Sequence, residues 1–272
     1  MLKARILTVL LLLPLFLAAL FFLPKTGWAL LVLGVVLIGA REWSKISSFS
    51  GFQGWVYVLL TLFIGLALLP ESSRSAHFML YGMAFFFWAL LVPLWLRNQW
   101  RTRQWLLMAL IGWVILIPTW LALVELRILG PSLLLGLLSA VWIADTAAYF
   151  SGRKFGRHKL APAISPGKTW EGVAGAFLGV TLYGLAWGMW DSSSVPFNFG
   201  LWQGILLLWL LTLFGILGDL FESWMKRVAG LKDSGRILPG HGGVLDRIDA
   251  LTAAMPLAAF GLLLIKNYNV LS

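Results

Sequence analysis

Long apolar segments recur along almost the whole chain, and they constrain its fold more than any other feature. A helix needs about 20 apolar residues to cross the hydrocarbon core of a bilayer. Nine segments approach this requirement: 6–24, 27–40, 54–70, 76–96, 104–124, 131–150, 171–190, 200–222 and 250–265. The chain is 60% hydrophobic and 12% charged, which is more apolar than a soluble protein of 272 residues. We therefore predict an all-α, polytopic membrane protein with about nine transmembrane helices.

The basic residues predict how these helices are oriented. The N-terminus and the gaps after the second, fourth, sixth and eighth spans hold 17 of the 21 Lys and Arg residues. The other side holds Lys25, Arg74, Arg127 and Lys266. By the positive-inside rule, the N-terminus faces the cytoplasm. The first span follows Lys3 and Arg5 as a signal peptide would, but its length and the lack of a cleavage-like exit favour a retained anchor.

The same distribution limits the partners and the domain organisation. The net charge of +10 lies in short gaps between apolar runs rather than on one soluble face, so we expect no nucleic-acid partner. The chain contains no cysteine, which excludes disulfides and thiolate metal sites. We divide the chain into N-terminal transmembrane helices (1–130) and a C-terminal transmembrane region (131–272). The polar cytoplasmic loops 151–170 and 223–249 of this second region are where we expect the chemistry.

Acidic side chains at the ends of spans indicate a cation site. An ionised side chain inside a span costs at least about 2.5–3.5 kcal/mol, yet Asp145 ends the sixth predicted span and Asp219 ends the eighth. Asp219, Glu222, Ser223 and Lys226 fall on one helical face, and Asp246 and Asp249 are three residues apart before the ninth span. Clustered carboxylates suit Mg²⁺, which prefers oxygen ligands. The alternative is an ion-pair network used only for packing, with Asp219 bonded to Lys226 or Arg247.

The two polar loops also carry basic residues and glycines that suit phosphate groups. The sequence "PGKT" looks like the end of a P-loop, but Pro162 occupies the position of the required first glycine, and we reject that interpretation. The alternative role for the loop is topogenic, in which its charge only sets orientation. In the second loop, "PGHGG" favours turns with exposed amides. His241 there could be a general base, a phosphate donor or only a structural link within the loop.

At this point the second half of the chain resembles the phosphatidate cytidylyltransferases (CDP-diacylglycerol synthases). The resemblance lies in Ser223-x-Met-Lys-Arg, then Lys232-Asp233-x-Gly235, then the run from Leu238 to Asp249, without a departure from the family pattern. A second block includes Asp145-Thr146, Tyr149-Phe150, Gly152-Arg153, Phe155-Gly156 and Ser165 to Gly172. Ala147 departs from it, because glycine is common there, and this affects helix packing more than chemistry.

The resemblance implies that CTP and phosphatidate react to give CDP-diacylglycerol and pyrophosphate. It implies a nine-span protein that uses Mg²⁺, with a monovalent cation, K⁺, beside it. It further implies a homodimer among membrane lipids, in a bacterial inner membrane, with the active site facing the cytoplasm.

This reaction assigns roles to the polar residues of the two loops. The best metal-ligand candidates are Asp219 and Asp246, followed by Asp249 and Asp145. The expected catalytic set is Asp219, Asp246, Lys226, Ser223 and Arg247, with Ser223 bonded to phosphate or metal. The expected substrate-binding residues are Arg153, Lys168, Arg227, Lys232, Arg236, His241, Gly242 and Gly243.

Two other function classes fit parts of the pattern. A CTP-dependent lipid kinase would transfer the γ-phosphoryl group to a lipid alcohol and release CDP. A secondary transporter would also place acids and broken helices in a membrane, but the acids lie at one rim and the halves show no inverted repeat. The D-G-x-x-A-R motif of CDP-alcohol phosphotransferases is absent from the chain.

Overall fold

A computed structural model describes residues 2–69, 74–190, 200–237, 240 and 242–271, with the side chains of 2–9, 74–75 and 265–271 left undescribed. Its elements are almost all helical. In chain order they are α1 (Leu2–Phe22), α2 (Lys25–Ile46), α3 (Gly51–Leu68), α4 (Arg74–Phe86), the π-helical segment η1 (Phe87–Leu91), α5 (Val92–Asn98), α6 (Trp105–Leu129), α7 (Pro131–Phe155), β1 (Lys159–Ala161), β2 (Ser165–Thr169), α8 (Trp170–Trp190), α9 (Leu201–Val228) and α10 (Leu245–Leu271).

Seven helical stretches of this described part are long and apolar enough to cross a membrane. They correspond to the third through ninth predicted spans, with α4, η1 and α5 joined as the stretch Ala76–Asn98. The chain is therefore an integral, polytopic membrane protein. The first two predicted spans fall on α1 and α2, which are outside this set, so the number nine stays a prediction.

The two polar loops differ from the prediction in their lengths and their structure. The helices α7 and α9 continue past residues 150 and 222 to Phe155 and Val228, and α10 begins at Leu245. The largely helical structure is consistent with the all-α prediction, and it adds one short antiparallel hairpin of β1 and β2 inside the predicted loop 151–170. Trp170 N donates to the carbonyl oxygen of His158 at the base of this hairpin, so the ladder leads directly into α8.

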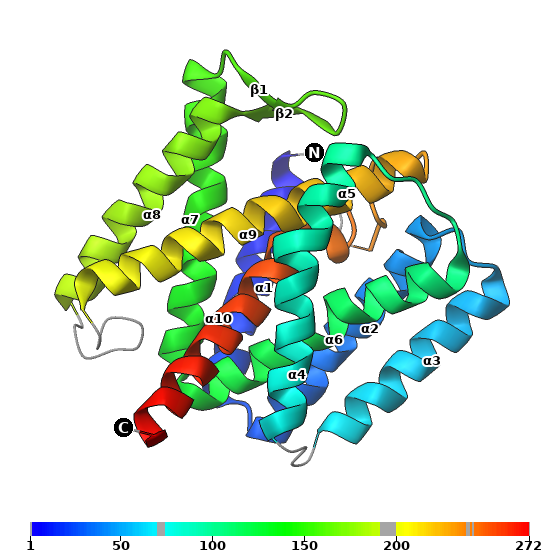
Figure 1. The fold of residues 1–272 in the computed structure, drawn as a ribbon, viewed down its shortest axis with the longest axis horizontal. Helices are drawn as coiled ribbons and strands as arrows, with labels where there is room; N and C mark the ends of the chain where they lie inside the picture. The colour runs from blue at the N-terminus through cyan, green and yellow to red at the C-terminus, as the bar shows by residue number, and fades with distance from the viewer. Residues whose placement is uncertain (1, 70–73, 191–199, 238–239, 241, 272) are drawn as a thin grey trace.

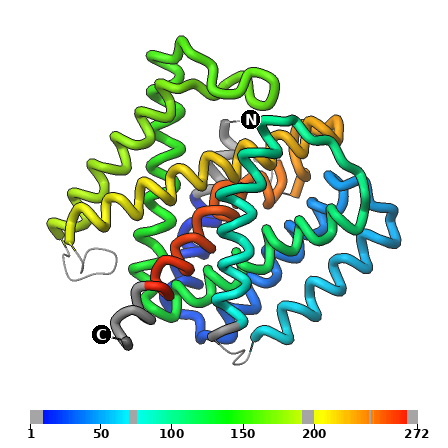
Figure 2. Tube along the Cα trace, viewed as in Figure 1, coloured from blue at the N-terminus to red at the C-terminus, as the bar shows by residue number. Residues whose placement is uncertain are grey.

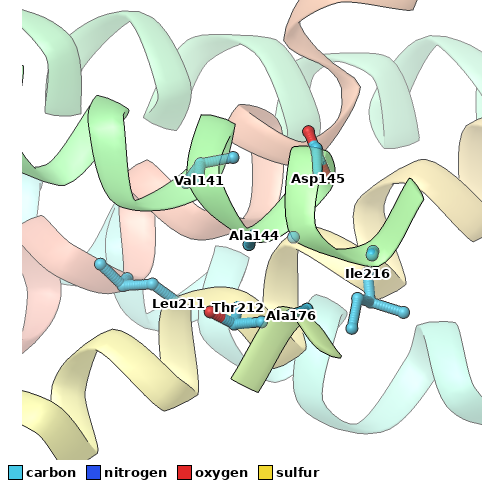
Figure 3. A pocket seen from close by; sticks show the side chains of 9 residues that line it. Val141, Ala144, Asp145, Ala176, Leu211, Thr212 and Ile216 are labelled. Atoms are coloured by element: carbon cyan, nitrogen blue, oxygen red, sulfur yellow. The ribbon is translucent and has the colours of Figure 1, made fainter. Parts of the chain in front are cut away.

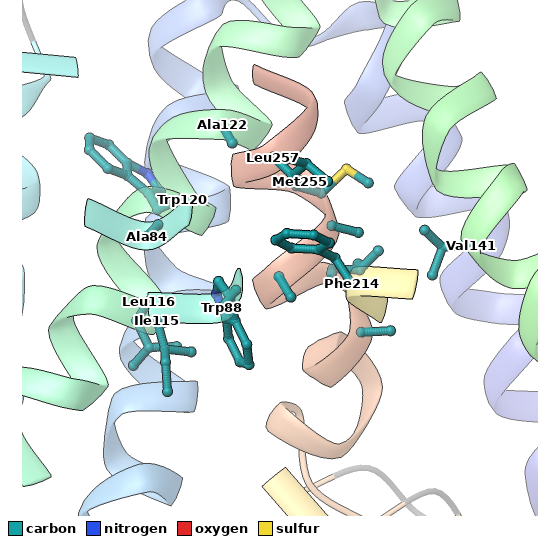
Figure 4. Close-up of a cluster of buried hydrophobic side chains, with 14 of the residues drawn as sticks. Ala84, Trp88, Ile115, Leu116, Trp120, Ala122, Val141, Phe214, Met255 and Leu257 are labelled. Atoms are coloured by element: carbon teal, nitrogen blue, oxygen red, sulfur yellow. The ribbon is translucent and has the colours of Figure 1, made fainter. Parts of the chain in front are cut away.

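The helix α10 occupies the middle of the bundle. It packs against α9, α6 and α4, while α7 packs against α8 and α2 packs against α3 and α6. In Figure 1, α3 lies at one edge of the molecule and α8 at the opposite edge. Buried side chains of α6, α9 and α10 meet in the core, among them Trp120, Phe214 and Met255 (Figure 4).

Indole hydrogen bonds fix α2 against α6. Trp43 Nε1 donates to the carbonyl oxygen of Met108 at 2.8 Å, and Trp120 Nε1 donates to that of Ala29 at 2.9 Å. Both rings are buried. Because a bilayer interior offers no water as a partner, these bonds satisfy indole donors that would otherwise be costly to bury. They hold the C-terminal end of α2 in a defined place relative to the rest of the bundle.

The polar connections gather at one end of the molecule. The start of α1, the α5–α6 connection, the hairpin and the segment between α9 and α10 lie toward the same end (Figures 1 and 2). The C-terminal end of α10 and the turn from α6 into α7 lie toward the other end. Helices of alternating direction therefore bring both sequence motifs together.

Candidate active site

The final turns of α9 carry four of the predicted site residues. Asp219 and Ser223 lie on the same face, and Ser223 Oγ donates to Asp219 Oδ1 at 3.3 Å. Glu222 and Lys226 are also four residues apart, with 3.1 Å between Lys226 Nζ and Glu222 Oε1. These four residues therefore lie along α9 as predicted from the sequence, and they form two adjacent pairs, Asp219 with Ser223 and Glu222 with Lys226.

Lys226 is enclosed by carboxylates. Its Nζ lies 2.6 Å from Asp246 Oδ1, in addition to the contact with Glu222, and all three side chains are largely buried. Opposite charges this close stabilise one another strongly, and removal of one partner would leave a buried charge uncompensated. We expected Lys226 to neutralise substrate phosphate, but in this structure its ammonium group links α9 to the start of α10.

Asp246 also organises the loop that precedes α10. Its Oδ2 accepts hydrogen bonds from Ser234 N at 2.9 Å and Gly243 N at 2.8 Å. The Gly243 amide, which we expected to bind substrate, is therefore engaged within the protein. Gly242 has a φ of +83°, a conformation that L side chains rarely adopt, so glycine is needed there. His241 lies outside the described residues.

The hairpin supplies a cation to Asp219. Lys168, on β2, places Nζ 2.5 Å from Asp219 Oδ2. The packing alternative named Lys226 or Arg247 as the partner of Asp219, whereas among the described residues the partner is Lys168 from the other polar loop. An ion-pair network of the kind that this alternative described is present around Lys226. The ion pair between Lys168 and Asp219 joins the family block that contains Lys168 to α9, four residues before the other block begins at Ser223.

Close helix packing brings further carboxylates toward Asp219. A Cβ atom at Gly218 would lie 2.5 Å from the carbonyl oxygen of Asp249, so α9 and α10 can approach this closely only because residue 218 is glycine. This contact places Asp249 beside Gly218, the residue that precedes Asp219, and Asp145 on α7 lines a pocket together with Ile216 of α9. Three helices, α7, α9 and α10, thus each contribute one carboxylate to a common region.

A small apolar pocket adjoins this region between α7, α8 and α9 (Figure 3). Asp145 and Val141 line it from α7, Ala176 from α8, and Thr212 and Ile216 from α9. Ala147, the one departure from the family pattern, lies nearby and packs against α8 at Gly179. Its effect is on helix packing, as we expected.

The predicted basic residues fall into two groups. Arg153 donates to Tyr149 Oη at 3.1 Å, and Arg227 donates to the carbonyl oxygens of Ile164 and Leu231 at 3.4 Å. By contrast, Lys232, Arg236 and Arg247 are exposed. Over the ranges that the structure describes, we find no ion pair to these last three cations. They are therefore available to bind anionic groups.

The carboxylates of this region could supply part of the oxygen shell that Mg²⁺ requires. In the described part of the chain, no group of three or more His, Cys, Asp or Glu side chains is arranged to hold a metal ion by itself. Mg²⁺ usually binds one or two carboxylates together with waters and substrate phosphates. The oxygen donors of Asp145, Asp219 and Asp249 fit that smaller requirement. Asp246 is the acid whose oxygens are most occupied by protein donors.

Sequence reasoning missed two residues of this site. Glu42, near the end of α2, accepts hydrogen bonds from the loop before α10. Ser234, at an open position of the second-half motif, contacts both Glu42 and Asp246. One signal in the sequence could have identified Glu42. The chain has only 11 acidic residues, and Glu42 is one that follows a long apolar segment.

We predict that Gly218→Ala destabilises the protein although alanine favours helices. The new methyl group would collide with backbone rather than a movable side chain, at a cost of about 1–3 kcal/mol in the free energy of unfolding. Gly34→Ala is the matched control, since nothing lies within 4 Å of its Cβ position. Thermal unfolding in detergent should give a lower Tm for Gly218→Ala than for the control. Equal Tm values would contradict the close approach of α9 and α10.

Comparison with known proteins assigns the chain to a family. The model of the cytidylyltransferase family matches residues 3–265. A phosphatidate cytidylyltransferase of Pseudomonas aeruginosa is 40% identical over 276 residues, covering 95% of this chain and 96% of that protein. The protein of the same name from Haemophilus influenzae is 33% identical over 284 residues, covering 96% of this chain and 98% of the relative. The one from Brucella suis is 36% identical and covers 85% of this chain and 82% of its own length. The chain belongs to the cytidylyltransferase family.

Proposed function

We propose that this protein transfers CMP from CTP to phosphatidate, forming CDP-diacylglycerol and releasing pyrophosphate. The relatives of this name match nearly its whole length. The structural observation that carries the proposal is the packing of α7, α9 and α10 against one another at the positions of Asp145, Asp219 and Asp249, at one end of an apolar bundle. Exposed cations lie on the adjacent segments. Such a place can receive a soluble nucleotide and a membrane lipid together.

The chemistry requires little help from a general base. The phosphate of phosphatidate is already an anion near neutral pH, and one of its oxygens attacks the α-phosphorus of CTP. The bond between that phosphorus and the β-phosphate bridge oxygen breaks, and pyrophosphate leaves with the electron pair. The main obstacle is repulsion between two anions, which positive charges fixed in advance can offset.

Different residues of this chain would bind the metal, contact the phosphates and hold these groups in position. Asp219, Asp249 and Asp145 would hold Mg²⁺, and K⁺ would bind beside it. A bound Mg²⁺ neutralises charge on the phosphates and aligns them. Arg247, Lys232 and Arg236 are free of ion pairs with other described residues and would contact the triphosphate or the lipid phosphate. Lys168 holds Asp219 in place, and Lys226 holds Asp246.

We place the glycerol end of the lipid at the apolar pocket beside Asp145, which at about 20 Å³ would have to widen between α7, α8 and α9 to admit it. The small residues of the pocket, including Ala144, Ala148 and Gly215, leave space between helices next to the acids. A lipid lying there would place its phosphate near Asp145 while its acyl chains stay in the bilayer.

We also propose a topology, a membrane location and an oligomeric state for the protein. The protein has nine spans, an N-terminus and an active site facing the cytoplasm, a bacterial inner-membrane location and a homodimeric state. The 17 basic residues of the N-terminus and even-numbered gaps support the orientation. The dimer would be refuted by a detergent-corrected mass of about one 30.2 kDa chain.

We predict that label from [α-³²P]CTP enters the lipid product, whereas label from [γ-³²P]CTP appears only in pyrophosphate. Purified protein would be incubated with phosphatidate and Mg²⁺, and EDTA should stop the reaction by removing the metal. Asp219→Asn should reduce turnover about a thousandfold or more, since it weakens both the metal site and the Lys168 ion pair.

The matched variant Glu125→Gln changes an interior carboxylate outside the site, bonded to Tyr81 Oη, and should keep near-normal turnover. Lipid labelled from the γ-position would instead establish a lipid kinase. Normal turnover by Asp219→Asn would refute the assigned metal ligand.

We predict that Ile216→Trp raises the KM for phosphatidate about tenfold by filling the pocket, with little change in the KM for CTP. Leu213→Trp is the control, because Leu213 lies on the same helix but outside the pocket lining and is exposed. Steady-state kinetics with phosphatidate in mixed micelles would measure both. An equal change in the two variants would place the lipid elsewhere.

We predict opposite accessibilities for cysteines at Asn98, which ends α5, and Leu129, which ends α6. Both positions are exposed, and these two helices end at opposite ends of the bundle (Figure 1). The chain has no cysteine of its own, so each single variant reports one site. An impermeant maleimide applied to spheroplasts should label Leu129→Cys and leave Asn98→Cys unmodified. The reverse pattern would overturn the orientation.

A further inference from the structure

Glu42 is a buried carboxylate whose hydrogen-bond partners all come from the segment leading into α10. Only 1% of its surface is exposed. Its Oε1 accepts from Val244 N at 3.1 Å, and its Oε2 accepts from Leu245 N at 2.7 Å and Ser234 Oγ at 3.0 Å. In the described ranges, we find no ion pair between Glu42 and a basic side chain. The described groups that bind this carboxylate are therefore hydrogen-bond donors of the segment leading into α10.

These contacts place Glu42 at the N-terminus of a site helix. The first amides of a helix have no partner within the helix itself, and a carboxylate is favoured beside them. The helix α10 begins at Leu245, and Glu42 binds the amide of that residue and of the one before it. A side chain from α2 therefore caps a helix about 200 residues later in the chain.

Ser234 connects this cap to the site. Its amide donates to Asp246 Oδ2, its hydroxyl donates to Glu42 Oε2, and the Asp246 amide donates to that hydroxyl at 3.3 Å. A substitution at Glu42 would thus affect the position of Asp246 through Ser234, which contacts both residues. Asp246 in turn holds Lys226, and Asp249 lies one helical turn further along α10.

Two glycines show how closely the loop surrounds this carboxylate. A Cβ atom at Gly235 would collide with Glu42, and one at Gly243 would collide with Glu42 and Ser234. Gly243 had been expected to bind substrate. Its location indicates that glycine is needed there because the Glu42 carboxylate occupies the adjacent space.

We propose that Glu42 is a positioning residue of the active site. It fixes Ser234 and residues 244–245 at the start of α10, so that Arg247 and Asp249 meet the reactants in one arrangement. The inference rests on the proposed function, and it assigns part of the machinery to the N-terminal helices, outside both sequence motifs.

The sharpest test is Glu42→Gln, which keeps the size of the side chain. An amide has one acceptor oxygen and an NH₂ group, so the NH₂ group must face a backbone N–H that previously had an acceptor. We expect kcat to fall about ten- to hundredfold, as for other residues that orient ligands from outside the first contact layer, while KM for phosphatidate stays unchanged. Glu42→Asp keeps two acceptor oxygens and should recover part of the lost kcat.

Hydrogen exchange provides a readout that does not depend on catalysis. In Glu42→Gln, the amides of Ser234 and of residues 243–245 should exchange faster than in the wild type, with Glu125→Gln as a control that leaves both exchange and kcat near wild type. Activities would be compared well below each Tm, so that partial unfolding does not contribute. If Glu42→Gln does not fold, Ser234→Ala removes one bond of the same link and should show a smaller loss of kcat with faster exchange.

Two results would overturn the proposal. The first is a wild-type kcat for Glu42→Gln, and the second is a reduced kcat without faster exchange at Ser234 and residues 243–245. A wild-type protein that does not form the labelled lipid would contradict the proposed function instead. Faster exchange in Glu42→Gln would then still establish the structural link.

Discussion

The structure depends on the pairing of charged groups at the end of an otherwise apolar bundle. Lys226 lies between Glu222 and Asp246, and Lys168 lies against Asp219. Each ionised group in such surroundings is costly to leave without a partner. The need for partners therefore decides where α9, α10 and the hairpin meet. It also leaves a set of carboxylates and free cations at one place, which the proposed reaction requires.

One consequence is that the site extends beyond the segments that identify the family. The second-half motifs supply Lys168, Lys226 and Asp246, but the first turn of α10 is capped from α2 by Glu42. Trp43, the next residue of α2, is held by its indole bond to α6. The N-terminal helices therefore act as a support against which the signature loop is ordered.

Much of this arrangement could be predicted from local sequence patterns. Hydropathy gave seven of the spans, and helical periodicity placed Ser223 beside Asp219 and Lys226 beside Glu222, because those contacts lie one turn apart. The pairing of Lys168 with Asp219 could not be predicted, because it depends on how a hairpin folds over a distant helix. Nor could the cap by Glu42, since a periodic pattern says nothing of contacts between residues 200 positions apart. Hydropathy ended the spans earlier than the helices end, because polar residues at the end of α9 continue the helix once they are paired.

The central claim is that carboxylates from separate helices share a single divalent cation. An experimental structure of the protein with CTP and Mn²⁺, with the ion located by its anomalous scattering, tests that claim directly. The account predicts an ion bound to Asp219 and to a carboxylate of α7 or α10. An ion that contacts acids of one helix only, or none of these acids, would contradict it.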